Sequence, residues 1–389
     1  MKQLKMGIIG VGNMGSFHAQ NIAAGKISGM QLCALCDIDP QRTMLLKQQY
    51  PTLPVFTDAD TMLKQADVDA IIIATPHYFH PQLAVLGFQN GKHVLTEKPA
   101  GVRVSDVRRM NAAAKASGKA FGIMFNQRTN PLFYRAKEMV ESGALGQLKR
   151  LVWIITNWYR TQSYYDSGGW RATWAGEGGG VLLNQAPHNL DLTQWIFGMP
   201  DRVRGFCSVG KYHHIEVEDD ATIYMEYASG ATAAFITSTG ESPGTNRLEI
   251  TGDKGKIVLE DGKLKWWKLG VPEREFCFQE KSGFFKPQID YAEYCPEEPE
   301  TAHCGILQNF ADHILNGEPL IAPGEDGILS LSISNAAYLS AWEDRWVKPG
   351  SDDDEFDRAL QQRIDRSVVV KTKGQRSGEN KSERWQVRW

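Results

Sequence analysis

The sequence predicts an α/β fold in which a doubly wound parallel sheet is followed by a second domain with a mainly antiparallel sheet. Three observations support this prediction. A glycine-rich turn lies between a short apolar run and an amphipathic segment, at residues 6–18. Strand-like and helix-like segments then alternate to about residue 125, and strand-like segments joined by short turns follow. Alternation favours a parallel sheet, whereas consecutive hairpins favour an antiparallel one.

Length and composition restrict the class of protein. A chain of 389 residues with a formal net charge of -3 exceeds one ordinary domain, so we expect domains at 1–126, 127–350 and 351–389. The charge indicates no nucleic-acid partner, and the longest apolar runs are too short to cross a membrane. The start of the chain shows no signal-peptide pattern, so we expect a cytoplasmic protein. Cys33 and Cys36 point to opposite faces of a strand-like run, so we expect no metal at this pair.

The glycine-rich turn has the pattern G-x-G-x-x-G and follows the apolar run 6–9. In this pattern the first glycine makes a tight turn, the second lets the backbone approach a pyrophosphate, and the third lets the helix pack on its strand. The helix N-terminus offers free N–H groups to the anion. The predicted cofactor-binding residues of this turn are Gly10, Gly12, Asn13, Met14 and Gly15.

A carboxylate follows the second predicted strand, 30–36, at Asp37. At the end of this strand it would accept hydrogen bonds from both ribose hydroxyls of an adenosine. The same charge repels a 2′-phosphate, and the next residue is Ile38 instead of an arginine. The sequence therefore predicts NAD as the cofactor, in preference to NADP.

The alternation continues with strands at 68–74, 93–95 and 120–125 and helices at 78–90 and 105–117. Ligands of parallel sheets bind at the carboxyl ends of the strands. Besides Asp37, these ends carry the segments 75–77, 96–99 and 126–128. We therefore expect the cofactor site at this edge of the sheet.

Beyond residue 126 the pattern changes to that of an antiparallel sheet. A helix is predicted at 131–142, and two more at 305–316 and 326–346. A short helix at 356–365 precedes a tail, 371–389, with a net charge of +4 from six Lys or Arg and two Glu residues. We expect a solvated tail; a docking segment anchored by Trp385 and Trp389 is the alternative. The predicted strands are 148–157, 202–209, 221–227, 231–238, 247–251, 256–260 and 263–269.

Four motifs belong together: the glycine-rich turn, the segment 74–76 with His80, the Glu-Lys-Pro segment 97–99, and the glycine triplet 178–180 followed by His188 and Asp191. With these motifs the chain resembles the Gfo/Idh/MocA family of sugar and cyclitol oxidoreductases. The resemblance covers residues 5–346 and implies a Rossmann domain, an open-faced second sheet, and a homo-dimer or homo-tetramer. The cofactor contacts predicted outside the glycine turn and Asp37 are Thr75, His80, Glu97, Asn126, Trp170 and Arg171.

The resemblance also implies that Lys98 lies at the nicotinamide and that His188 faces it from the second domain. Oxidation of a secondary alcohol needs a group that takes the hydroxyl proton and a cation that stabilises the developing alkoxide. A lysine beside the positive cofactor ring should have its pKa lowered from about 10.4. A histidine serves as general acid and base near neutral pH.

The segment before His188 departs from the family pattern. The family commonly has an aspartate four residues before the histidine, where this chain has Asn184. We predict Asn184 as a catalytic residue that contacts substrate, yet an amide cannot hold an imidazolium by charge. Either His188 acts without a charged partner, or Asp191 provides the charge. Pro187 should kink the helix, because a proline inside a helix removes a hydrogen bond.

The segment 157–174 is rich in aromatic and charged residues. Flat aromatic faces beside Arg and Asp suit a pyranose or cyclitol ring, and packing at a domain interface is the alternative. The predicted substrate contacts are Lys98, Arg128, Trp158, Tyr165, Asn184 and His188.

The predicted function is NAD-dependent hydride transfer between the nicotinamide and a secondary alcohol of a sugar, glycoside or cyclitol. Two alternatives keep the same cofactor. One is a glycosidase that acts by transient oxidation and elimination, as in glycoside hydrolase family 109. The other is a non-catalytic NAD-dependent sensor. We expect a small carbohydrate or cyclitol as the partner and no metal ion.

Overall fold

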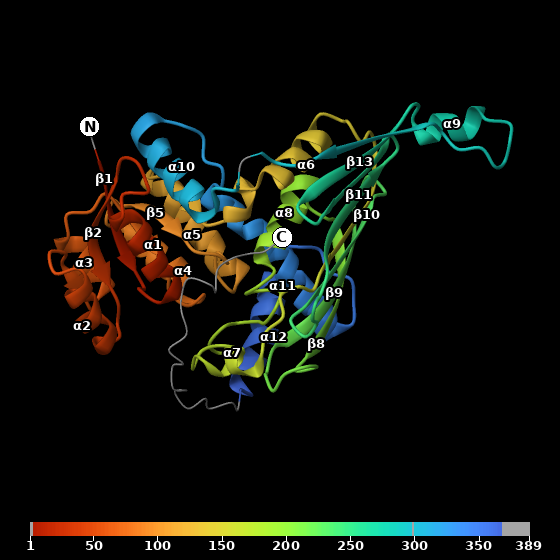
Figure 1. The fold of residues 1–389 in the computed structure, drawn as a ribbon. Coiled ribbons are helices and arrows are strands. Elements are labelled where there is room, and N and C mark those ends of the chain that lie inside the picture. Colours follow the sequence, from red (N-terminus) through yellow and green to blue (C-terminus); the bar gives the residue numbers. More distant parts are fainter. Residues whose placement is uncertain (1–2, 298, 368–389) are drawn as a thin grey trace. The chain divides into compact units, whose positions relative to one another are not determined.

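A computed structural model describes residues 3–297 and 299–367, which form two compact units (Figure 1). The first unit contains the described residues up to 130 together with 300–332, and the second contains the described residues of 131–299 and 333–367. Helix α11 (Gly327–Glu343) begins in the first unit and ends in the second.

The first unit is built on six parallel strands, and the α-helices between them have 7 to 14 residues. Its elements are β1 (Leu4–Ile9), α1 (Asn13–Ala23), β2 (Met30–Cys36), α2 (Pro40–Gln49), β3 (Val55–Phe56), α3 (Ala59–Gln65), β4 (Ala70–Ile73), α4 (Phe79–Gln89), β5 (His93–Thr96), α5 (Val104–Ser117), β6 (Phe121–Ile123), η1 (Asn126–Thr129), α10 (Ala302–Asn316) and η2 (Gly324–Asp326).

The strand order β3-β2-β1-β4-β5-β6 reverses at β1, which pairs with both β2 and β4. Ile8 lies opposite Leu35 on one side and Ile72 on the other, and all three are fully buried. Continuous apolar runs of this kind belong to strands that are covered on both faces. The predicted parallel sheet is confirmed, and its switch point brings the ends of β1, β2 and β4 together.

One segment of the first unit comes from far along the chain. Helix α10 packs against β1 and η1 through Ile306, Leu307 and Phe310, which are buried. Farther on, Ile123 N–H donates to Ala322 O at 3.1 Å. The expected boundaries, 127–350 for the second domain, are therefore wrong for 300–332. These residues bury their apolar side chains on the first sheet.

The second unit is built on eight strands. Its elements are α6 (Pro131–Glu141), β7 (Leu148–Ile155), α7 (Gln162–Asp166), α8 (Pro187–Phe197), β8 (Arg202–Val209), β9 (Glu218–Glu226), β10 (Thr232–Ser238), β11 (Asn246–Gly252), β12 (Gly255–Glu260), β13 (Lys263–Leu269), α9 (Glu273–Gln279), β14 (Ile289–Tyr294) and α12 (Asp353–Asp365).

The second sheet has the order β14-β13-β12-β11-β7-β10-β9-β8 and is mainly antiparallel; β7 and β10 run parallel. Trp153, Phe235 and Leu248 point to a face covered by helices such as α6 and α8, and they are buried (Figure 1). The opposite face carries Val152 and Arg247, and no helix of the described chain covers it. This alternation agrees with the predicted open-faced sheet.

Helix α8 begins at Pro187, so the predicted kink is absent. Proline fits the first helical position because it lacks the N–H that would be unpaired there. Asn184 lies in the turn before the helix, so it does not share a helical face with His188.

Helix α12 forms where a short helix was predicted and begins three residues earlier. The predicted tail, 371–389, with Trp385 and Trp389, lies outside the described residues. Within the described ranges no helix is both long and apolar enough to cross a membrane.

Candidate functional site

The glycine-rich turn connects β1 to α1 as the sequence predicts. Gly10 has a φ of +86°, and a Cβ on Gly15 would lie 2.0 Å from Gly10 O, so both positions require glycine. A Cβ on Gly12 would meet only Arg42 Nη1, at 3.6 Å. Gly12 is the N-cap residue of α1 and no side chain caps the helix, so the N–H groups of its first turn can donate to an anion.

Asp37 lies at the end of β2, and backbone groups fix its carboxylate. Its Oδ2 accepts from Val11 N at 2.8 Å and its Oδ1 accepts from Asp39 N at 3.0 Å. Arg42 Nη1 donates to Oδ2 at 3.1 Å. Sequence reasoning missed Arg42, which lies five residues along the chain in the first turn of α2. A guanidinium therefore faces the carboxylate that is predicted to hold the ribose.

Two predicted cofactor residues carry polar atoms that need a partner. Thr75 Oγ1 and Asn126 Oδ1 are buried, and neither has a hydrogen-bond partner within the described chain. They follow β4 and β6 at the edge of the sheet that carries Asp37. Buried polar atoms are normally hydrogen bonded, so a polar ligand fits here. These residues, with the glycine turn and Asp37, fit a dinucleotide.

His80 takes a supporting position. Its Nε2 lies 2.7 Å from Thr75 O and its Nδ1 lies 2.8 Å from Pro99 O. Burial lowers the pKa of His80, although both carbonyls favour the protonated ring. The His80 imidazole therefore connects the loop after β4 to the loop after β5 and holds the predicted cofactor residues in these loops in place.

Glu97 holds the backbone of Lys98 at the end of β5. Its Oε2 accepts from Lys98 N at 3.2 Å, and its Oε1 lies 2.7 Å from His18 Nε2 on α1. The ring of His303, from α10, lies 5.9 Å from that of His18. Lys98 itself is half-buried. Sequence reasoning missed His18 and His303, and nothing local marks His303, which is about two hundred residues away.

The charges around Glu97 determine its ionisation. Burial would raise the pKa of this carboxyl, but the hydrogen bond and charge of His18, with the charges of His303 and Lys98, lower it to about 2. Burial lowers the pKa of His303 to about 4, against the attraction of Glu97. Glu97 is therefore ionised at neutral pH and presents its charge next to Lys98.

Arg128 does not have the position expected of a substrate contact. Its side chain is 1% exposed, and its Nη1 donates to Asp326 Oδ2 at 2.7 Å and to Ile321 O at 3.2 Å. The guanidinium also lies 5.4 Å from the ring centre of Phe125. The structure gives Arg128 a structural role, in which it joins the segment 300–332 to the rest of the first unit.

In the second unit, a buried carboxylate fixes the glycine triplet that precedes α8. Glu218 Oε2 accepts from Gly180 N and Oε1 from Leu182 N, both at 2.9 Å, and Tyr338 donates to Oε1 at 2.7 Å. A Cβ on Gly180 would lie 1.9 Å from Glu218 O. Burial raises the pKa of Glu218 to about 7, although the three hydrogen bonds favour the ionised form. The triplet therefore requires glycine because it packs directly on β9.

Glu177 is a functional candidate that the sequence reasoning missed. It is 2% exposed and accepts hydrogen bonds from Asn184 Nδ2 and from Ala172 N. Asp191, the carboxylate expected to assist His188, is 1% exposed and accepts from Gln194 Nε2 at 3.0 Å. His188 is half-buried in the first turn of α8.

Arg171 joins several of the predicted aromatic residues. Its guanidinium lies 4.6 Å from the ring centre of Tyr164 and 4.7 Å from that of Trp170, and it donates to Tyr164 Oη at 2.8 Å. Gln185 Nε2 donates to the same hydroxyl at 3.2 Å. These contacts bring Trp170, Arg171 and the turn before α8 into one polar network. Their predicted contact with the cofactor stays a prediction.

The two aromatic residues predicted to contact substrate differ. Trp158 is half-buried, and its Nε1 is a buried donor without a partner in the described part of the chain. Tyr165 is 2% exposed and is hydrogen bonded to Thr239 Oγ1 at 2.7 Å. Burial raises the pKa of Tyr165. The structure therefore retains Trp158 as a candidate, whereas Tyr165 packs in the interior.

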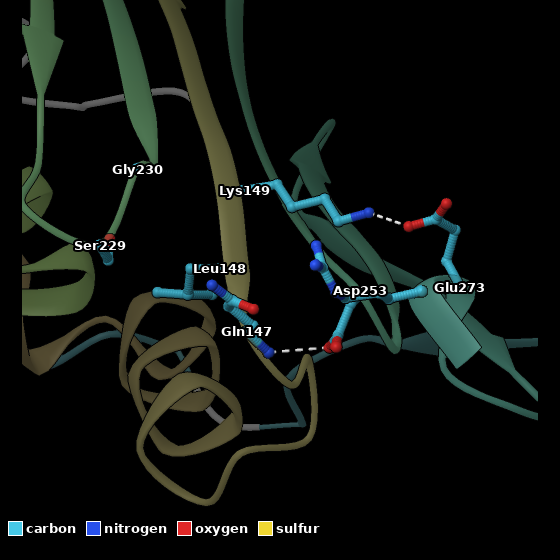
Figure 2. A pocket seen from close by; sticks show the side chains of 8 residues that line it. Gln147, Leu148, Lys149, Ser229, Gly230, Asp253 and Glu273 are labelled. Carbon is cyan, nitrogen blue, oxygen red and sulfur yellow. Dashed lines mark hydrogen bonds and ion pairs between the residues drawn. The ribbon is translucent and has the colours of Figure 1, made fainter. Parts of the chain in front are cut away.

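A surface pocket in the second unit lies apart from all these residues (Figure 2). Its polar groups pair with one another: Gln147 N donates to Asp253 Oδ1 at 2.8 Å, and Lys149 pairs with Glu273. No predicted site residue lines it. Nor do the described residues contain a group of His, Cys, Asp or Glu side chains that could hold a metal ion.

Comparison with known proteins agrees with this description. The family "Oxidoreductase family, NAD-binding Rossmann fold" matches residues 4–125, and the "GFO/IDH/MocA C-terminal domain" matches residues 133–258. The first unit is therefore an NAD-binding domain.

Two relatives and one solved structure illustrate the similarity. Myo-inositol 2-dehydrogenase of Thermotoga maritima is 26% identical over 89% of this chain and 98% of its own. The 1-carboxy-3-chloro-3,4-dihydroxycyclo hexa-1,5-diene dehydrogenase of Comamonas testosteroni is 32% identical over 68% of this chain and 69% of its own. The WlbA dehydrogenase of Bordetella pertussis, solved with NADH and UDP-GlcNAcA, is 26% identical, with a TM-score of 0.74 over 89% of this chain and 99% of its own.

Proposed function

Because the chain belongs to the Gfo/Idh/MocA family of NAD-binding oxidoreductases, we propose that it oxidises a secondary alcohol of a sugar or cyclitol, or reduces the corresponding ketone. One observation carries the proposal. The carboxylate of Glu97 fixes the backbone of Lys98 at the end of β5, on the edge of the sheet that also carries Asp37, Thr75 and Asn126. A lysine held at a cofactor edge suits alcohol oxidation better than it suits a sensor.

The proposed cofactor contacts follow from the site. The glycine turn and the N-terminus of α1 would hold the pyrophosphate, Asp37 the ribose, and Thr75 and Asn126 the polar groups nearer the nicotinamide. When bound, the nicotinamide supplies the hydride acceptor. The family-implied contacts at Trp170 and Arg171 belong to the same proposal.

The chain itself would handle the proton and the charge. Lys98 would stabilise negative charge on the substrate oxygen through its ammonium. His188, half-buried at the start of α8, would take the hydroxyl proton as general base and return it in the reverse reaction. Asn184 would hydrogen bond the substrate.

The substrate class rests on the relatives. One of them is a myo-inositol dehydrogenase, and the WlbA dehydrogenase structure contains UDP-GlcNAcA; both compounds are rings that carry secondary alcohols. The half-buried Trp158, whose Nε1 has no partner in the described chain, offers a flat face and a donor suited to such a ring. Assembly into a homo-dimer or homo-tetramer stays a prediction, to be tested by light scattering.

A substrate screen tests the function. The purified protein with NAD+ would be given inositols, aldoses, sugar acids and glycosides, and nicotinamide reduction would be followed at 340 nm. We expect turnover with at least one ring alcohol. Release of an aglycone without net nicotinamide reduction would instead indicate the glycosidase. A protein that binds NAD+ but turns over no compound in the panel would contradict the proposal.

A further inference from the structure

A carboxylate, that of Glu177, contacts the turn before α8. Asn184 occupies the position at which the family commonly has an aspartate, but Glu177 contacts it. Glu177 Oε1 accepts a hydrogen bond from Asn184 Nδ2, across the glycine triplet. A carboxylate is therefore present, but it contacts the amide of Asn184 instead of occupying position 184 itself.

The partners of Glu177 suit an ionised carboxylate. Its Oε2 accepts from Ala172 N at 2.5 Å, and the guanidinium of Arg171 lies 3.8 Å from Oε1. A buried charge is costly unless it is paired and hydrogen bonded. Here one oxygen contacts the backbone and the other contacts the amide of Asn184, with a cation close by.

This arrangement fixes the orientation of the Asn184 amide. An ionised carboxylate can only accept hydrogen bonds, so the amide must turn its Nδ2 toward Glu177. With Nδ2 directed to Glu177, Oδ1 is the acceptor atom of the Asn184 side chain. An aspartate at position 184 would bring two carboxylates into contact, and their repulsion would raise the pKa of the pair. Asn184 and Glu177 therefore form a matched pair.

We propose that Glu177 is a positioning residue that holds Asn184 as a hydrogen-bond acceptor for the substrate. This inference rests on the proposed function, because it assigns Oδ1 of Asn184 to a substrate hydroxyl. It also defines the substrate class further. The ligand must donate a hydroxyl hydrogen at this point, as a ring polyol does and a ketone alone does not.

A charge exchange between the two positions tests the proposal. The variants are E177Q, N184D and the double variant E177Q/N184D, assayed with the ring alcohol that the screen identifies. In E177Q a single oxygen must serve both Ala172 N and Asn184 Nδ2, so we expect kcat to fall about 10- to 100-fold, with the Kd for NAD+ unchanged. The matched control is E275Q on α9, whose side chain is exposed; it should behave as the wild type.

The pH profiles separate positioning from simple structural support. N184D should lose activity as the pH rises from 5 to 8. Glu177 and the carboxylate introduced at position 184 share one proton only at the acidic end of this range. The double variant restores one carboxylate and one amide, so it should recover to within about tenfold of the wild type and lose this pH dependence. An E177Q kcat equal to that of the wild type would overturn the inference while leaving the proposed function intact.

A second measurement needs no turnover. In protein labelled with 15N-asparagine, the side-chain amide signal of Asn184 is the one that N184D removes. Because a charge-assisted hydrogen bond becomes neutral, E177Q should shift its Nδ2 proton upfield. A signal that does not move would overturn the inference even if the screen finds no substrate, in which case the proposed function fails separately.

Discussion

Two buried carboxylates, Glu97 in the first unit and Glu218 in the second, have pKa values shifted in opposite directions. Burial favours the neutral form of both. Near Glu97, the hydrogen bond and charge of His18 and the charge of Lys98 outweigh burial and lower the pKa to about 2. Glu218 is held by two backbone N–H groups and the hydroxyl of Tyr338, and burial raises its pKa to about 7. A cation offsets the cost of burial where these neutral donors do not.

The difference gives the two units opposite responses to pH. The stabilisation from Glu97 is present above its ordinary pKa of 4.5 and is lost as the pH falls toward 2. The stabilisation from neutral His303 is present above pH 6.5 and is lost as the pH falls through its lowered pKa of about 4. The contribution of Glu218 is present below 4.5 and is lost as the pH rises through about 7. Acid therefore weakens the first unit, and the rise from pH 4.5 to about pH 7 weakens the second.

The largest effect is expected from removing the cation next to Glu97. Lys98→Met should lower kcat about 10³-fold, because in the proposed reaction the ammonium of Lys98 stabilises negative charge on the substrate oxygen. NAD+ binding, measured by calorimetry, should be nearly unchanged. Lys64→Met removes an exposed lysine paired with Asp60 and serves as the control. Substantial turnover by Lys98→Met would contradict the catalytic role.

Glu97→Gln tests the first half of the comparison. Losing the charge between His18 and Lys98 should lower the free energy of unfolding by about 3 kcal/mol at pH 7. Near pH 3 the difference should shrink, since the wild type is losing the same interaction. Urea unfolding, with hydrogen exchange of a peptide covering 93–98, would measure it. An equal loss of unfolding free energy at pH 7 and near pH 3 would mean that the charge of Glu97 is not the cause.

Glu218→Gln tests the second half. At pH 5 it removes an acceptor from Gly180 or Leu182, which should cost about 2 kcal/mol of unfolding free energy. At pH 8 the difference in unfolding free energy between the variant and the wild type should be smaller, because Glu218 of the wild type is then ionised while buried, which destabilises the wild type. Glu226→Gln, at the other end of β9, provides the control. A variant whose deficit grows with pH would contradict the raised pKa of Glu218.

The smallest effect is expected at Asp37, where the cation is partly exposed. The Arg42 side chain is 29% exposed, so its pairing with Asp37 is weaker than a buried one. Arg42→Ala leaves the carboxylate uncompensated and should raise the preference for NAD+ over NADP+ about tenfold. Binding of both nucleotides by calorimetry would measure the ratio, and an unchanged ratio would show that Arg42 does not affect discrimination.

The sequence by itself determined the elements and the cofactor end of the first unit. The strands β1, β2, β4, β5 and β6 and the hairpins from β8 to β13 follow from apolar runs and turn residues that are close in the chain. The glycine turn was predictable for the same reason, because its three glycines lie within six residues. The family motifs also indicated Lys98, His188 and Asn184, whose roles stay predictions.

Only the tertiary structure decided which distant residues meet. It brought His303 to His18, the partner of Glu97, Asp326 to Arg128, and Glu177 to Asn184, and it buried Tyr165 against Thr239. No periodic pattern records such pairs, because each depends on the packing of segments that are remote in the sequence or turn back on themselves. The charge state of a buried carboxylate depends on those neighbours, so the opposite behaviour of Glu97 and Glu218 emerges only in the folded chain.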